Sequence, residues 1–153
     1  MDAFDADVLI YAAVPGHPLG RRVAALFTVE PPGEAGEPGA SARPVRFAGA
    51  GSVLLLPEVL GKPLRDGDTG EVQALAALLA RIDLRPVDRA IAELATVVAS
   101  TYSLRAADAV HVATAISLGA ERFITNNRRD FPSAIREIDI TYPADLPDPA
   151  AVS

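Results

Sequence analysis

Apolar and polar positions along the 153-residue chain follow two different periods. Short apolar runs, typical of buried strands, stand at 4–12, 53–56, 84–87, 123–125 and 135–142. Between them, apolar residues recur at the spacing of amphipathic helices, at 19–29, 69–82, 88–98 and 105–118. Alternating strands and helices predict an α/β fold with a small parallel sheet flanked by helices. In such sheets, ligands bind beyond the carboxyl ends of the strands.

Helix-start and helix-stop residues mark the ends of several predicted helices. Pro57 suits the first turn of a helix and places Glu58 in that turn. Residues 68–71, Asp-Thr-Gly-Glu, match a capping box, and Asp88 is a second candidate for an N-cap. Gly119 suits the C-terminal end of the last predicted helix.

The length of the chain suits one domain spanning residues 1–153. Residues 31–44 are rich in proline, glycine and alanine, so they bury little apolar surface and are predicted to form a flexible insertion. The pieces on either side are each too small to fold alone, which argues against a domain boundary there. The tail from about residue 143 carries three further prolines and is expected to fray.

Composition narrows the chemistry that the chain can perform. The absence of cysteine excludes disulfides, thiolate metal sites, Fe–S clusters and cysteine nucleophiles. The chain has two histidines, His17 and His111, and this makes a histidine-rich zinc site improbable. A metal site would therefore use oxygen ligands, which favours Mg²⁺ or Mn²⁺ over zinc or copper.

Charge and hydropathy indicate where the protein works and what it binds. The net charge of −6 argues against a general basic surface for nucleic acid, but it is compatible with a local basic rim around an acidic pocket. The acidic N-terminal segment does not match a secretory signal, and no apolar run reaches the roughly 18 residues of a membrane span. We therefore expect a soluble, cytoplasmic protein with no membrane partner.

Four acidic residues, from distant parts of the sequence, are placed where a parallel sheet would bring them together. Asp5 lies within the first apolar run, Glu58 follows the second, and Asp130 follows the run at 123–125. Asp108 lies in the first turn of a predicted helix. Alone, each has an ordinary alternative: an edge position for Asp5, a helix-dipole contact for Glu58 and Asp108, and an exposed loop for Asp130.

Together, the four acids favour a divalent cation. Two carboxylates about 4 Å apart repel each other by roughly 1–4 kcal/mol, depending on the local dielectric. Bound Mg²⁺ would offset this repulsion, lower the pKa of a bound water and stabilise the leaving oxygen in phosphodiester hydrolysis. His111, one turn after Asp108, is expected to be a hydrogen-bonded core or rim residue and not a ligand. Attack by water is then the simplest mechanism.

Four segments together resemble the PIN domain, and within that group the VapC-type toxins of bacterial toxin–antitoxin pairs. They are FDADVLIY at 4–11, LLLPEVL at 54–60, LRAADAVHVATA at 104–115 and FITNNRRDF at 123–131. The resemblance implies a three-layer α/β/α sandwich and a Mg²⁺- or Mn²⁺-dependent endoribonuclease. It also implies a homodimer and a small antitoxin protein as partner.

The resemblance assigns roles to the four acids. The family's first three acids fall on Asp5, Glu58 and Asp108. Many relatives have their fourth acid where this chain has Asn127, and others have it at the position of Asp130. We therefore assign Asp5, Glu58, Asp108 and Asp130 as catalytic and metal-binding residues, with Asn127 as a neutral ligand or water holder.

Further residues of the same motifs have supporting roles by resemblance. Thr125 and Asn126 would position the loop or a bound water, and the role of Asp7 is open because relatives often have asparagine or serine there. Three arginines beside the acids are candidates to bind the flanking phosphates of RNA, with solvated surface residues as the alternative. They are Arg105, Arg128 and Arg129.

Two other functions compete with this interpretation. Residues 5–8, Asp-Ala-Asp-Val, also fit the D-x-D pattern of haloacid-dehalogenase-like phosphatases. Those enzymes need a well-placed lysine and a later acidic pair, whereas this chain has one lysine, Lys62, and no Asp-Asp pair. The second alternative is a PIN-like binding protein with weak or lost catalysis, for which Asn127 in place of an acid is the support.

Overall fold

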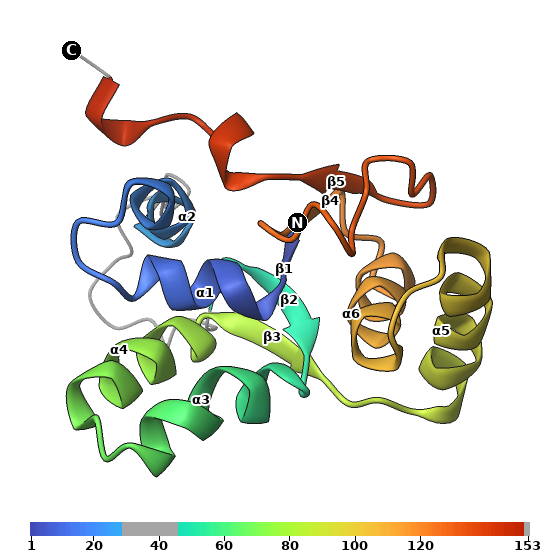
Figure 1. Ribbon diagram of the computed structural model, residues 1–153, viewed down its shortest axis with the longest axis horizontal. Helices are drawn as coiled ribbons and strands as arrows, with labels where there is room; N and C mark the ends of the chain where they lie inside the picture. Colours follow the sequence, from blue (N-terminus) through green and yellow to red (C-terminus); the bar gives the residue numbers. More distant parts are fainter. Residues whose placement is uncertain (29–45, 152–153) are drawn as a thin grey trace, which may run out of the picture.

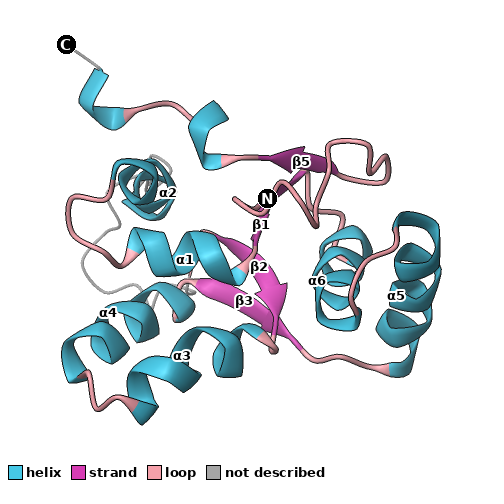
Figure 2. Ribbon diagram, viewed as in Figure 1, coloured by secondary structure: helices cyan, strands magenta, loops and turns pink. Residues whose placement is uncertain are grey.

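Five parallel strands form the centre of the molecule (Figures 1 and 2). They are β1 (Asp2–Phe4), β2 (Gly49–Ser52), β3 (Ile82–Arg85), β4 (Arg122–Ile124) and β5 (Asp139–Thr141), in the spatial order β3-β2-β1-β4-β5. The structure is a computed structural model that describes residues 1–28 and 46–151. The chain adds β2 and β3 on one side of β1, and then returns to add β4 on the other side. The carboxyl ends of β1 and β4 thus form a topological switch point, where α/β proteins bind ligands.

Helices cover both faces of this sheet. They are α1 (Ala6–Ala12), α2 (Pro18–Thr28), α3 (Leu55–Arg65), α4 (Thr69–Leu79), α5 (Arg89–Tyr102) and α6 (Ala106–Ser117). Figure 1 shows α1 to α4 on one side of the sheet, and α5 and α6 on the other. The predicted three-layer α/β/α sandwich with a small parallel sheet is confirmed.

Neighbouring residues of the central strands point to opposite faces of the sheet, so they enter two separate cores. Phe4 of β1 and Ile124 of β4 pack with buried residues of α1 to α4. Ala3 and Phe123 pack with α5, α6 and the segment that leads into β5. Because both strands are buried on both faces, packing fixes the backbone position of the residues that follow them at the switch point.

The prediction of a strand over 4–12 is wrong, because β1 is shorter and helix α1 follows it directly. Asp5 stands between the two elements with extended backbone (φ −84°, ψ 162°). Its side chain accepts a hydrogen bond from the backbone N–H of Ala6 and so caps the helix. A short apolar run fits a strand or a buried helix equally well, and here Val8 and Leu9 are buried as helical residues.

The prediction of a strand at 53–56 is also wrong. Strand β2 lies just before it and has the sequence Gly-Ala-Gly-Ser, while the apolar run leads into α3. Small residues are required in β2 because a Cβ atom at Gly49 would meet the backbone oxygen of Asp2 in the neighbouring strand. A Cβ atom at Gly51 would lie 2.6 Å from the side chain of Leu55. A strand of such small residues has no hydrophobic pattern to reveal it.

The other strands lie close to their predicted places. Strand β3 begins two residues before the predicted run at 84–87, and β4 begins one residue before the run at 123–125. Strand β5 occupies a short part of the predicted run at 135–142. The predicted insertion at 31–44 lies outside the described residues.

The helix caps agree with the sequence signals. The side chain of Asp68 accepts a hydrogen bond from the backbone N–H of Glu71, and that of Asp88 accepts one from Ile91. Gly119 follows the end of α6 with φ at +67°, a left-handed conformation that glycine adopts without strain. These signals therefore place three of the helix ends correctly.

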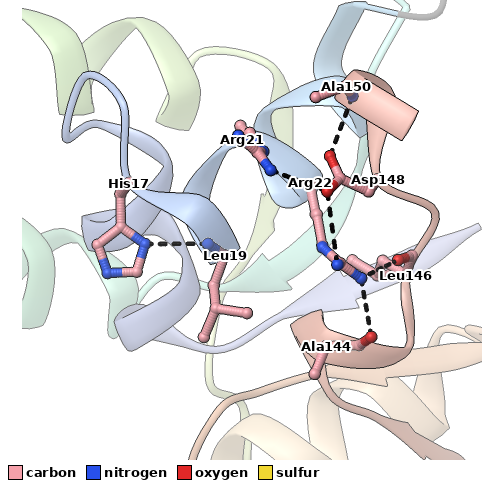
Figure 3. A network of polar contacts seen from close by, with 8 residues as sticks. All are labelled: His17, Leu19, Arg21, Arg22, Ala144, Leu146, Asp148 and Ala150. Carbon is pink, nitrogen blue, oxygen red and sulfur yellow. Dashed lines mark hydrogen bonds and ion pairs between the residues drawn. The ribbon is translucent and has the colours of Figure 1, made fainter. Parts of the chain in front are cut away.

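The tail contacts α2, whereas the sequence led us to expect fraying (Figure 3). It contains two short 3-10 helices, η1 (Pro143–Asp145) and η2 (Pro149–Ala151). Arg21 donates a hydrogen bond to the carboxylate of Asp148 at 2.8 Å, and Arg22 donates one to the backbone oxygen of Leu146, also at 2.8 Å. The side chain of Leu146 is buried in the same core as α1 to α4.

No helix of the described residues is long and apolar enough to cross a bilayer.

The contact between α1 and α2 provides a test of the fold. A Cβ atom at Gly20 would meet the backbone carbonyl of Tyr11 in α1, whereas a Cβ atom at Gly61 in α3 would meet nothing within 4 Å. We expect Gly20→Ala to lower the free energy of unfolding by about 1–3 kcal/mol, because the backbone cannot move aside. Gly61→Ala should raise it by up to about 1 kcal/mol through helix propensity. Urea denaturation measures both, and equal effects of the two substitutions would contradict this packing.

Candidate functional site

The candidate site lies at the switch point between β1 and β4. Asp5 follows β1, and Thr125 follows β4. The backbone N–H of Asp5 donates to the carbonyl oxygen of Ile124 at 2.9 Å, which extends the pairing of the two strands by one residue. The hydroxyl of Thr125 donates to Oδ2 of Asp5 at 2.8 Å. The two strands thus fix the carboxylate of Asp5 from both the backbone and the side chain.

The carboxylate of Asp5 is buried, with 7% of the residue exposed. Burial raises the pKa of this carboxyl above its ordinary value. The hydrogen bond from Thr125 and the charge of His111 oppose this rise without cancelling it. Among the described residues, no lysine or arginine forms an ion pair with Asp5. A buried carboxylate without a basic partner is costly, and a cation would relieve that cost.

Glu58 and His111 meet beside Asp5. Glu58 stands in the first turn of α3, and His111 stands on α6, on the opposite side of the sheet. Nε2 of His111 lies 3.2 Å from Oε1 and 3.1 Å from Oε2 of Glu58. The histidine side chain is 1% exposed, and the glutamate side chain is 34% exposed. Burial lowers the pKa of His111, but the hydrogen bond and charge of Glu58, together with the charges of Asp5 and Asp108, raise the pKa overall.

These three residues form the donor group that best fits a metal ion. One ligand atom from each of Asp5, Glu58 and His111 lies within 4.8 Å of the other two. No other group of three or more acidic, histidine or cysteine side chains in residues 1–28 and 46–151 lies this close together. Two carboxylates, one of them buried, match the oxygen ligands that Mg²⁺ and Mn²⁺ prefer. The side chains therefore fit a hard divalent cation.

Asp7 lies on the rim of this group. Burial and the charge of Asp5 raise its pKa to about 7. Its carboxylate accepts a hydrogen bond from the backbone N–H of Asn126 at 3.1 Å. Asp7 thus links the first turn of α1 to the loop that follows β4.

Asp108 is half-buried in the first turn of α6. It lies outside the group of donors within 4.8 Å, yet it shares the same electrostatic environment. Burial raises its pKa, and the charges of Asp5 and Asp130 raise it further. The structure therefore brings Asp5 and Glu58 into one group of potential ligands and sets Asp108 beside that group.

Asp130 is bonded within its own loop. Its Oδ2 accepts a hydrogen bond from Nδ2 of Asn127 at 2.8 Å, and its backbone N–H donates to Oδ1 of Asn127 at 3.1 Å. The backbone N–H of Asn127 donates in turn to the hydroxyl of Thr125. Since Thr125 also contacts Asp5, a chain of hydrogen bonds connects Asp130 to the centre of the site.

The three candidate arginines are exposed, and one of them is held in place. The guanidinium carbon of Arg128 lies 3.9 Å from the ring centroid of Tyr142, a cation–π contact. The hydroxyl of Tyr142 donates to the backbone oxygen of Phe131 at 2.7 Å, which fixes the ring. Arg129 lies in the same loop, and Arg105 directly precedes α6. The loop after β4 and the start of α6 therefore carry positive charge near the acids.

Sequence reasoning placed His111 in the core or rim and did not expect it in the candidate donor group. The residue is in fact 2% exposed, as a core residue would be, but it faces Glu58. One signal was available, because His111 follows Asp108 by one helical turn and so shares its helix face. The contact with Glu58 depends on how α3 and α6 approach each other, and no local sequence pattern encodes that.

Comparisons with known proteins agree with the fold. The family model of the PIN domain matches residues 3–136. Among solved structures, a toxin–antitoxin complex from Klebsiella pneumoniae contains a chain with a TM-score of 0.66 and 22% sequence identity, over 94% of this chain and 98% of that chain. At this identity the likeness shows the fold. No curated protein matches the chain significantly.

The hydrogen bond from Thr125 to Asp5 can be tested by removing the hydroxyl. Thr125→Val keeps the shape of the side chain but leaves the buried carboxylate without this donor, so we expect the free energy of unfolding to fall by about 1.5–3 kcal/mol. Thr125→Ser keeps the hydroxyl and loses one methyl group, so it should lose only about 1 kcal/mol. Urea denaturation in EDTA measures both variants. A valine variant as stable as the wild type would show that this bond contributes nothing.

Proposed function

The chain belongs to the PIN domain family, and from this premise we propose that it is a Mg²⁺- or Mn²⁺-dependent endoribonuclease. PIN domains are generally nucleases, that is, hydrolases of phosphodiester bonds. The observation that carries the proposal is the convergence of Asp5 and Glu58, from separate elements, at the switch point of the sheet. The family match also favours a nuclease over the haloacid-dehalogenase-like phosphatase considered from the D-x-D pattern.

We assign Asp5 and Glu58 as the residues that would hold the metal ion, with Asp108 and Asp130 as further acids of the site. When bound, the metal would activate a water molecule and stabilise the leaving oxygen of the cleaved bond. Thr125 orients the carboxylate of Asp5 through their hydrogen bond. These acids define where the scissile phosphate would lie, beyond the carboxyl ends of β1 and β4.

The loop after β4 would shape the entry to the site. The carboxylate of Asp7 accepts a hydrogen bond from the backbone N–H of Asn126, and the side chain of Asn127 donates one to Asp130. We assign these residues a supporting role, in which they keep the loop in one conformation. The alternative is a PIN-like binding protein with weak catalysis. Two observations favour it: Asn127 stands in place of an acid, and the side chain of Asn127 donates a hydrogen bond to one carboxylate oxygen of Asp130.

RNA would approach through the arginines. Arg105, Arg128 and Arg129 are exposed beside an acidic centre, where they would bind the phosphates on either side of the cleaved bond. The stacking of Arg128 on Tyr142 supports this role, because it holds the guanidinium in one position before RNA arrives. Such contacts are electrostatic and carry no base preference of their own.

We further propose that the protein is the toxin of a toxin–antitoxin pair, acting in the cytoplasm as one domain of residues 1–153. Its similarity to a chain of a toxin–antitoxin complex over 94% of its length supports this proposal. Its partner would be a small antitoxin protein. We also propose a homodimer, as in the VapC-type toxins that its motifs resemble.

Cleavage of defined RNAs tests the enzymatic proposal. We expect the wild-type protein to cleave RNA with Mg²⁺ or Mn²⁺, to stop in EDTA and to recover when the metal is restored. Asp5→Asn should reduce the cleavage rate by about 100-fold or more, because the removed charge stabilises the transition state through the metal. Asp145→Asn, at an exposed acid outside the site, is the matched control and should cleave like the wild type. Cleavage that survives EDTA or Asp5→Asn would contradict the proposed site, and a protein that binds RNA but never cleaves it would favour the binding alternative.

Growth of bacterial cells tests the role as a toxin. Induced expression of the wild-type chain is expected to arrest growth, whereas Asp5→Asn at the same protein level should not, because it lacks nuclease activity. Co-expression of a short protein encoded beside the gene should restore growth in the first case. Arrest by both forms alike would show that the effect does not come from the proposed nuclease.

A further inference from the structure

His111 is the one member of the donor group whose role the proposed nuclease leaves open. Its Nε2 atom lies almost equally far, 3.2 and 3.1 Å, from the two carboxylate oxygens of Glu58. An ionised carboxylate offers acceptors only. A nitrogen that faces both of its oxygens must therefore carry a proton, since a lone pair in that direction would be repelled. The contact is a shared N–H donated by His111 to Glu58.

The other ring nitrogen distinguishes a hydrogen-bond donor from a metal ligand. Nδ1 of His111 is buried and has no hydrogen-bond partner in the part of the chain that the structure describes. A histidine that binds a metal through one nitrogen keeps its proton on the other, where it almost always donates to an acceptor. Metal binding through Nε2 would move the proton to Nδ1 and bury an N–H group without an acceptor there. The surroundings of the ring therefore disfavour ligation.

The difference in exposure between the two partners indicates which residue positions the other. The side chain of Glu58 is 34% exposed in the first turn of α3 and would be free to move without a partner. The side chain of His111 is 1% exposed, and its neighbour Val112 on α6 is fully buried in the core. The buried His111 thus donates the hydrogen bond that restrains the more exposed side chain of Glu58.

We propose that His111 is a positioning residue: its Nε2–H holds the carboxylate of Glu58 beside Asp5, and the cation of the proposed nuclease is bound by carboxylates and not by imidazole. This inference rests on the proposed function, since it concerns the metal of that site. Its consequence is that loss of the Nε2–H weakens metal binding although His111 supplies no ligand atom.

The experiment combines spectroscopy of the full-length wild type with binding measurements on variants. Mn²⁺ bound to the wild-type protein is examined by pulsed electron paramagnetic resonance for coupling to the ¹⁴N nucleus of a ligating imidazole, and we expect no such coupling. Calorimetric titration with Mn²⁺ then compares His111→Leu and His111→Gln with the wild type. His111→Leu removes the donor and should weaken Mn²⁺ binding about 10–100-fold.

The remaining variants separate positioning from mere packing. His111→Gln places an amide N–H near the position of Nε2 and should recover most of the wild-type affinity. His17→Gln, on the turn before α2, is the control for loss of a histidine elsewhere and should bind Mn²⁺ like the wild type. Thermal unfolding of each variant checks that it is folded, and the spectrum of the wild type needs no variant at all.

The outcomes that contradict these expectations separate the role of His111 from the existence of the metal site. An imidazole ¹⁴N coupling in the wild type, a leucine variant that binds Mn²⁺ as tightly as the wild type, or a glutamine variant as weak as the leucine variant would overturn the role of His111 alone. A wild-type protein that binds no Mn²⁺ at any concentration tested would overturn the metal site, and with it both the proposed nuclease and this assignment.

Discussion

The arrangement of the candidate site depends on one buried carboxylate at the middle of a parallel sheet. Asp5 follows the central strand and caps the next helix. It also accepts a hydrogen bond from the hydroxyl of Thr125, which follows the neighbouring strand. Burial disfavours its charge, and the described residues supply hydrogen bonds but no lysine or arginine partner. The fold therefore buries a carboxyl group whose charged form has no lysine or arginine partner within residues 1–28 and 46–151, and a cation would stabilise that form.

Small residues in β2 allow its neighbours to pack closely against the sheet. A Cβ atom at Gly49 would meet the backbone of β1, and one at Gly51 would meet the side chain of Leu55 in α3. Helix α3 follows β2 and brings Glu58 beside Asp5. On the opposite side of the sheet, α6 brings His111 to the same point. The candidate donor group is thus built from the end of β1, from α3 and from α6.

The fold could be predicted from the sequence where hydrophobic periodicity and capping residues indicated the same element. At 69–82 and 88–98, periodicity and a capping aspartate indicated the same helix, and the structure has α4 and α5 there, although α4 ends at Leu79 and Ile82 belongs to β3. At 4–12 we interpreted the apolar run as a strand, whereas the structure has helix α1 there, capped by Asp5. Strand β2 could not be predicted because it lacks large hydrophobic residues. The pairing of His111 with Glu58 could not be predicted either, because it is a contact between two helices that lie 53 residues apart.

The same acidic cluster constrains how the proposed enzyme would meet its substrate. The chain carries a net charge of −6, and Asp5, Glu58 and Asp108 would repel a phosphate with an energy of roughly 1–4 kcal/mol for each charge at about 4 Å. Arg105, Arg128 and Arg129 are exposed, and in the described part of the chain no arginine forms an ion pair with Asp5. A divalent cation at Asp5 and Glu58 would reverse the local sign where the scissile phosphate must lie. The metal of the proposed nuclease would then serve two purposes, since it would activate the attacking water and also admit the RNA backbone to a site that repels it otherwise.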